Sequence, residues 1–269
     1  MKKGVDRLNQ QQDDQERLNI LNWLTPIDYA LQQSDFIKRR EPGTGQWLLD
    51  SPEFQTWLKD DKQMLFCHGI PGSGKTILAS VVIHELTTDF SNDETFAIAY
   101  VYCNFRRKHE QKAEDTMANL LKQLAQYKHS LPENVKLLYD KYKKQRTQPS
   151  FDEIFSALQS AATLYSRVFI VVDALDEYQA INGERERLIL GLFSLQAKCG
   201  VNIFATSRFM LPEVEKHFKE RTSLEIRASE EDVRKYLDRH IPELPGAVFQ
   251  SQELQEKIKT AIVNAVDGM

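Results

Sequence analysis

Short apolar runs alternate with helical patterns along most of the chain. The runs that fit buried strands lie at 64–67, 96–105, 168–172, 201–205 and 223–226. Between them, apolar residues recur at helical spacing, as in Ile77 to Leu86 and in Glu184 to Cys199. Strands that alternate with helices favour a parallel sheet covered by helices on both faces. We therefore predict an α/β fold with a doubly wound, five-stranded parallel sheet.

Further helices are expected between the strands and at the two ends of the chain. Residues 116–124 have helical spacing, 133–142 form another helix before a polar loop at 143–148, and a capping box opens a third at Ser150. Residues 5–22 are polar with sparse apolar positions, which predicts a solvated helix or a linker. The aromatic-rich stretch from Trp23 to Leu58 predicts helices packed on the domain that follows. After Ala228, a second capping box over Ser229 to Asp232 and an apolar stripe at 254–265 predict two more helices.

The first predicted strand runs into a glycine-rich turn and then into a helix that starts with Lys-Thr. Glycines let backbone N–H groups face inward without Cβ clashes, and free N–H groups at a helix start stabilise an anion by roughly 0.3–2 kcal/mol. In this context the pattern predicts a phosphate-binding loop. Its residues are Gly69, Pro71, Gly72, Ser73, Gly74, Lys75, Thr76 and Ile77. Lys75 is expected to reach the outer phosphates of a nucleotide, and Thr76 to ligate Mg²⁺.

A group of acids follows the third apolar run. Asp173 ends this run roughly a hundred residues after Lys75, where an NTPase with such a loop places the acid that organises Mg²⁺. We expect Asp173 to bind the metal mainly through water. Asp176 or Glu177 is expected to polarise the attacking water as general base, with a solvated acidic turn as the competing interpretation.

Three basic segments are weaker candidates. Arg208 ends a strand and would face the γ-phosphate if that strand lies between the loop strand and the Asp173 strand; an ordinary polar strand exit is the alternative. The segment from Arg106 to Lys108 is interpreted as a solvated loop in preference to an arginine finger on a neighbouring protomer. The turn from Arg39 to Gly45 could reach the base or ribose, although a plain turn is the preferred interpretation.

Composition and charge exclude several classes. A net charge of −4 over 269 residues creates no field that would gather nucleic acid. The three cysteines, Cys67, Cys103 and Cys199, lack CxxC spacing and favour buried thiols in a reducing compartment over disulfides or a zinc site. The start of the chain lacks an apolar leader, and no segment approaches the roughly 20 apolar residues of a membrane span. We expect a soluble, cytoplasmic protein.

Taken together, these motifs resemble the NACHT class of STAND NTPases. The resemblance rests on the phosphate loop, on Val171-Val172-Asp173-Ala174-Leu175-Asp176-Glu177 and on Ala205-Thr206-Ser207-Arg208. The upstream segments 42–49 and 53–58 are similar to those of fungal NOD-like receptors. Covering residues 23–269, the resemblance implies strand order 5-1-4-3-2, with the Arg208 strand beside the loop strand. Ala174 differs from AAA+ proteins, where a catalytic Glu follows the aspartate, so the choice between Asp176 and Glu177 stays open.

The resemblance also implies an organisation and a role. We expect a polar segment at 1–22, a helical segment at 23–62, the NACHT nucleotide-binding domain at 63–227, and a truncated helical lid at 228–269. Family members are switches that are closed with ADP and oligomeric with ATP, and they carry an N-terminal effector domain and C-terminal repeats. We therefore expect a slow ATPase that binds ATP, ADP and Mg²⁺ in a fungal incompatibility or innate-immunity receptor. The alternatives are a non-hydrolysing scaffold and, less favoured, a small-molecule kinase; the chain lacks the Asn-Lys-x-Asp motif of GTPases, which favours ATP.

Overall fold

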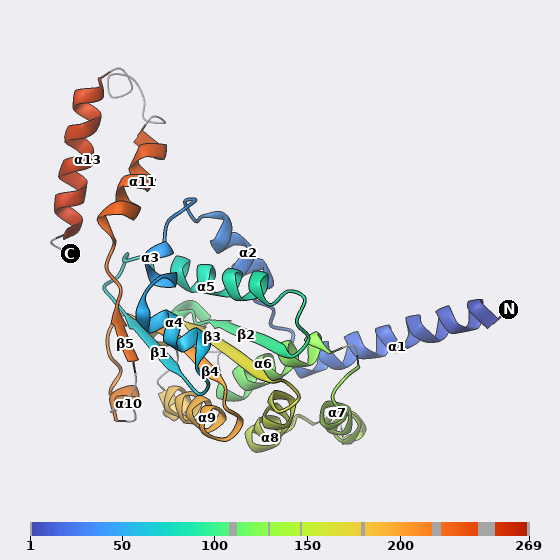
Figure 1. The fold of residues 1–269 in the computed structure, drawn as a ribbon. Helices are drawn as coiled ribbons and strands as arrows, with labels where there is room; N and C mark the ends of the chain where they lie inside the picture. The colour runs from blue at the N-terminus through green and yellow to red at the C-terminus, as the bar shows by residue number, and fades with distance from the viewer. Residues whose placement is uncertain are drawn as a thin grey trace.

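A parallel β-sheet forms the centre of the molecule (Figure 1). The computed structural model describes residues 2–107, 112–128, 130–145, 147–178, 181–216, 222–241 and 251–267. The strands are β1 (Met64–His68), β2 (Phe96–Tyr102), β3 (Arg167–Asp173), β4 (Asn202–Ser207) and β5 (Thr222–Glu225). They lie in the order β2-β3-β4-β1-β5, and every neighbouring pair is parallel. The predicted fold class and the strand order implied by the resemblance are both confirmed.

Helices cover both faces of this sheet (Figure 1). One face carries α5 (Lys75–Asp89), with α2 (Ala30–Lys38) and the short α3 (Gln46–Leu49) above it. The other face carries α6 (Ala113–Tyr127), α8 (Phe151–Ala162) and α9 (Glu184–Cys199). Helix α7 (Glu133–Gln145) packs on α8, and the short α10 (Pro212–Glu215) packs on α9. Helix α7 continues three residues beyond the predicted end at Tyr142, so the loop predicted from residue 143 starts too early.

The two predicted capping boxes have different outcomes. Ser150 Oγ accepts from Glu153 N, and the Glu153 carboxylate accepts from Ser150 N, so the first box is complete. At the second, Ser229 Oγ accepts from Asp232 N at 3.0 Å, which is half of a box. The other half of the predicted box, in which the Asp232 carboxylate would accept from Ser229 N, is wrong. This carboxylate accepts instead from Gly45 N and Trp47 Nε1, which are donors far away in the sequence.

Helix α4 (Pro52–Lys59) anchors the segment before β1 onto the core. Its Trp57 is 1% exposed and contacts Phe54, Phe169 and Phe204, with ring centroids 5.2–5.8 Å from its own. The Trp57 indole N–H also donates to Ile203 O at 2.9 Å. A buried aromatic group with a satisfied polar atom is a strong packing contact. The expectation that aromatic helices pack on the sheet is thus confirmed for this helix.

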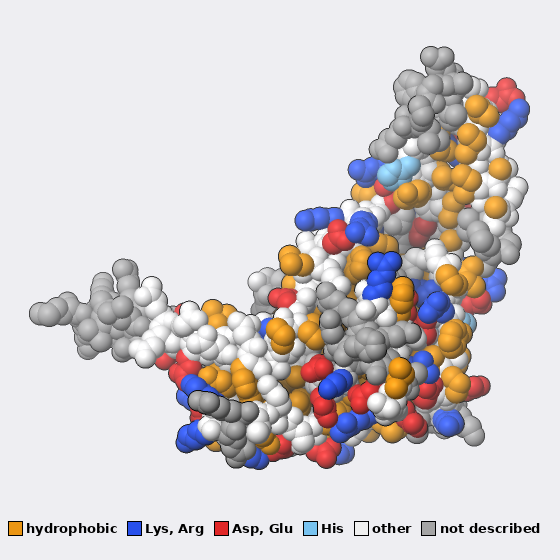
Figure 2. All heavy atoms as spheres, turned by 180° about the vertical axis from the view of Figure 1, so that it is seen from behind, with side chains coloured by type: hydrophobic (Ala, Val, Ile, Leu, Met, Phe, Trp, Pro, Cys, Tyr) orange, Lys and Arg blue, Asp and Glu red, His pale blue; other side chains and the backbone are white. Residues whose placement is uncertain are grey.

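Two helical parts project from this body (Figure 1). Helix α1 (Lys2–Leu24) extends outward, and it joins the core near Ile20 and Leu21, which are both buried. Helices α11 (Glu230–His240) and α13 (Gln252–Asp267) pack together on the opposite side, and Figure 2 shows hydrophobic side chains on their surface. None of the described helices combines the length and the apolar character that a membrane crossing requires.

Candidate nucleotide-binding site

The phosphate loop connects β1 to α5, and its glycines meet two different requirements. Gly72 and Gly74 have φ angles of +86° and +89°, which favour glycine, and a Cβ on either would meet no atom within 4 Å. At Gly69, by contrast, a Cβ would lie 2.3 Å from Ile226 O, so only glycine allows the exit of β5 to pass this closely. The loop therefore combines a left-handed turn that glycine adopts without strain, open on the side of the two later glycines, with a tightly packed base.

The ammonium group of Lys75 lies across this loop. Its Nζ donates to Gly69 O at 2.6 Å and to Ile70 O at 2.7 Å. Burial lowers the pKa of Lys75, whereas the nearby carboxylates of Asp176 and Asp173 act to raise it. A positive charge held beside an open turn of backbone N–H groups fits a phosphate group.

The Asp173 carboxylate lies between two hydroxyl groups at the end of β3. Thr76 Oγ1 donates to its Oδ2 at 2.8 Å, and Thr206 Oγ1 donates to its Oδ1 at 2.7 Å. Asp173 is 3% exposed; burial raises its pKa, while the two hydroxyls lower it. A carboxylate in contact with a hydroxyl beside a phosphate loop supplies the oxygen ligands that Mg²⁺ prefers in phosphate sites. These residues fit the metal predicted from the sequence.

Strand β4 lies between β1 and β3, which meets the condition placed on Arg208. The backbone N of Arg208 donates to Asp176 Oδ1 at 3.0 Å, and the Nε of Arg208 donates to Asp176 Oδ2. The Asp176 side chain is only 1% exposed, while that of Arg208 is 45% exposed. Both carboxylate oxygens of Asp176 are therefore engaged in holding Arg208, and the left-handed Ala174 (φ +52°) turns the chain toward this contact.

Unlike Asp176, which contacts Arg208, Glu177 lines a hollow of about 440 Å³ together with Thr76 and Asp173. Its Oε2 accepts from Phe105 N at 3.3 Å. Arg106 also lines this hollow, whereas Lys108 of the same predicted loop lies outside the described residues. Of the two acids left open by the sequence, Glu177 is the one that shares a hollow with Thr76 and Asp173.

Helix α2 contributes to the same hollow in a way that the sequence reasoning missed. Gln32, Phe36 and Arg39 all line it, and their spacing of four and three residues places them on one face of the helix. The adjacent Gln33 docks the helix, because its amide donates to Ser80 O at 2.9 Å and accepts from Tyr102 Oη. The helical spacing was available in the sequence, but it did not show which face would meet the site.

A larger pocket of about 560 Å³ lies on the other side of the loop. Its walls come from the phosphate loop, the first turns of α5, the turn before α3, and α11. The lining residues include Gly72, Gly74, Ile77, Leu78, Val81, Thr44, Gly45, Trp47, Val233 and Tyr236. The turn from Arg39 to Gly45 thus meets the phosphate loop in space, as the sequence hypothesis of a base or ribose contact requires.

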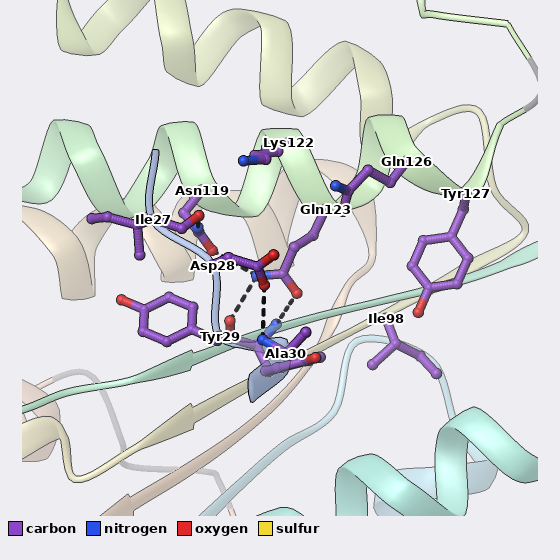
Figure 3. Close-up of a pocket in the computed structure, with 11 residues that line it drawn as sticks. Ile27, Asp28, Tyr29, Ala30, Ile98, Asn119, Lys122, Gln123, Gln126 and Tyr127 are labelled. Atoms are coloured by element: carbon purple, nitrogen blue, oxygen red, sulfur yellow. Dashed lines mark hydrogen bonds between the residues drawn. The ribbon is translucent and has the colours of Figure 1, made fainter. Parts of the chain in front are cut away.

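A third cavity, of about 310 Å³, lies beside the edge strand β2 (Figure 3). Its amide groups bind backbone: Gln123 pairs with the N and O of Tyr100 at 2.9 and 2.7 Å, and Asn119 donates to Ile27 O. Lys122 donates to Thr25 O at 2.9 Å. These contacts close the edge of the sheet and attach the segment before α2, so a structural role accounts for them.

Comparisons with known proteins cover the part of the chain that holds this candidate site. The family described as Nephrocystin 3, N-terminal matches residues 43–208, from the turn before α3 to Arg208. The vegetative incompatibility protein HET-E-1 of Podospora anserina is 28% identical over 137 residues, which is 49% of this chain. That match spans only 10% of the length of HET-E-1.

Solved structures add information on the fold alone. A Walker-type ATPase of Pyrococcus abyssi matches with a TM-score of 0.50 and 13% identity, covering 82% of this chain and 64% of its own. The Orc1 protein of Aeropyrum pernix, solved in complex with DNA, matches with a TM-score of 0.49 and 16% identity over 84% of this chain and 54% of its own. The family match covers more than half of the chain. The chain therefore belongs to the family described as Nephrocystin 3, N-terminal, and it is a NACHT-like NTPase of the STAND class.

Proposed function

We propose that this chain binds ATP and ADP at the phosphate loop, hydrolyses ATP slowly, and serves as the switch module of a signalling receptor of fungal NOD-like type. One observation carries the proposal: four side chains come together at the carboxyl edge of one sheet. They are a lysine on a glycine-rich loop, a buried aspartate between two hydroxyls, an acid that shares a hollow with that aspartate, and an arginine. These residues are Lys75, Asp173, Glu177 and Arg208.

The roles of the individual residues follow from their contacts. Thr76 and Asp173 would hold Mg²⁺, which when bound neutralises charge on the phosphates. Glu177 is proposed as the general base because it faces the hollow that Thr76 and Asp173 line. Asp176 is proposed to position Arg208 toward the γ-phosphate, since both of its oxygens are bound by that residue.

The slow rate and the switching role rest on the resemblance to NACHT proteins. In related NTPases an arginine from a second protein contributes about 10³–10⁵ to the rate, so a chain without such a partner should turn over slowly. Exchange of ADP for ATP would then be coupled to assembly with further copies of the chain. The effector and repeat domains, and a cytoplasmic location, are proposed on the same basis.

Two alternatives can be distinguished from this proposal by experiment. A nucleotide-stabilised scaffold would show a thermal shift with ADP and ATP but no phosphate release. A small-molecule kinase would transfer the γ-phosphoryl group to an acceptor, so it would form ADP only when an acceptor was present and would release no inorganic phosphate. We expect a thermal shift with ADP, with ATP and with a non-hydrolysable ATP analogue, together with slow phosphate release from ATP that needs no acceptor.

Replacing Glu177 with glutamine should preserve nucleotide binding and lower phosphate release by about 10²–10⁴-fold, the usual contribution of a general base. Asp176→Asn tests the other acid under the same conditions. It should weaken the contact with Arg208, because the amide lacks the negative charge and has one acceptor oxygen in place of two, and so lower turnover through that residue. Single-turnover hydrolysis measures both variants, and calorimetry checks that each still binds ADP. If Glu177→Gln hydrolyses ATP at the wild-type rate, Glu177 is not the base.

A further inference from the structure

The half-formed capping box at the start of α11 marks a contact between distant parts of the chain. Asp232 Oδ2 accepts from Gly45 N at 2.8 Å and from Trp47 Nε1 at 3.2 Å, across more than 180 residues of sequence. A capping acid normally returns to the backbone of its own helix. Here the carboxylate instead holds the turn before α3.

More contacts follow the same stripe of α11. Lys235 Nζ donates to Gly43 O at 3.0 Å, and Arg239 lies 3.2 Å from the Glu41 carboxylate, whose side chain is 12% exposed. Positions 232, 235 and 239 are three and four residues apart, so they share one face of the helix. We call this set of contacts between residues 41–47 and α11 the clasp.

The turn held by the clasp is also pressed onto the helix that carries the phosphate loop. A Cβ at Gly45 would lie 2.8 Å from Leu78 Cδ2 of α5, so turn and helix are in close contact there. Gly45 therefore connects α5, which starts at Lys75, with α11. The pocket of about 560 Å³ beside the phosphate loop lies between these parts, with Trp47, Val233 and Tyr236 in its walls.

We propose that Asp232 is a positioning residue of the nucleotide site: through Gly45 and Trp47 it holds α11 over the pocket beside the phosphate loop and sets the rate at which nucleotide leaves. This inference rests on the proposed nucleotide binding. A bound nucleotide with its phosphates on the loop would place its base side in this pocket. Leaving would then require α11 and the turn to separate, which breaks two charge-assisted hydrogen bonds.

The test measures the release of radiolabelled ADP, chased with unlabelled ADP, from wild type and variants. Asp232→Ala should raise the dissociation rate at least about tenfold, with a smaller change in the association rate. Asp232→Asn keeps the side-chain shape and should show an intermediate increase. Glu230→Ala is the matched control, because it removes an exposed acid from the same turn of α11 that pairs only with Arg234 among the contacts of the described residues.

Trp47→Phe tests whether Asp232 acts through the turn. It removes the indole N–H and keeps a ring in the pocket wall, so it should speed release less than Asp232→Ala. In the double variant the two effects should not add, since both remove the same contact. Hydrogen exchange of residues 43–47 without nucleotide should be faster in Asp232→Ala than in wild type, which reports the clasp independently of ligand.

The outcomes separate this inference from the proposed function. If Lys75→Ala abolishes binding while Asp232→Ala releases ADP at the wild-type rate, only the clasp proposal is overturned. Additive effects of Asp232→Ala and Trp47→Phe would also overturn it. If wild type binds no ADP while exchange at 43–47 still responds to Asp232→Ala, the contact exists but both the gating role and the proposed nucleotide binding fail.

Discussion

Replacing Lys75 with alanine should abolish measurable binding of both ADP and ATP. The ammonium group of Lys75 lies within 2.7 Å of two carbonyls of the phosphate loop, at the place where phosphate charge would be held. Each hydrogen bond to a charged group contributes about 1.5–3 kcal/mol, so the loss should weaken binding by roughly 100-fold or more. Calorimetric titration of each nucleotide with Mg²⁺ measures this change.

Two comparisons make this result specific. Lys198→Ala removes an exposed lysine from the last turn of α9 and should leave both affinities unchanged. Thermal unfolding without nucleotide should show that Lys75→Ala remains folded, since the loop is not part of the hydrophobic core. Wild-type affinity in a folded Lys75→Ala variant would refute the site and, with it, the proposed function.

Replacing Trp57 with alanine should lower the free energy of unfolding more than any other substitution proposed here. Its ring is 1% exposed and lies among Phe54, Phe169 and Phe204, and its N–H satisfies Ile203 O. Removing a buried tryptophan side chain usually costs about 3–5 kcal/mol, because the cavity it leaves is only partly filled. For a chain of this size, that corresponds to a fall in Tm of roughly 6–20 °C. Differential scanning calorimetry would measure the change.

The matched control for this change is Trp23→Ala. Trp23 is only partly buried and contacts Tyr139 edge to face, with the ring centroids 5.2 Å apart. Its loss should therefore cost clearly less than the loss of Trp57. Equal destabilisation by the two variants would mean that α4 does not anchor the segment before β1 to the sheet. That segment carries the turn at 41–47, so its attachment also supports the pocket.

Local features of the candidate site could be predicted because their causes are local. The glycines of the phosphate loop, the lysine that starts α5 and the aspartate that ends β3 each follow from the conformation of a few neighbouring residues. The alternation of strands and helices likewise depends on hydrophobic period, which any short window of sequence contains. The complete capping box at Ser150 is a further example, since all of its atoms lie within four residues.

Features that depend on contacts between residues far apart in the sequence could be predicted only conditionally, or could not be predicted at all. The predicted role of Arg208 required β4 to lie between β1 and β3, and the sequence alone could not choose between Asp176 and Glu177 as the base. Asp232 looked like a local cap, but its carboxylate found better donors in Gly45 and Trp47 once α11 packed over them. A buried acceptor pairs with the donor that the fold places nearest to it. For the Asp232 carboxylate, these donors come from another part of the chain.

The sequence by itself therefore determined the phosphate loop, the aspartate that ends β3 and the alternating α/β architecture, because short-range backbone preferences and hydrophobic period specify them. Only the tertiary structure decided which acid shares a hollow with Thr76 and Asp173, which residues of α2 line the same hollow, and that the turn at 41–47 closes against α11. These arrangements depend on strand order and on the packing of helices far apart in the chain. No short window of residues contains that information.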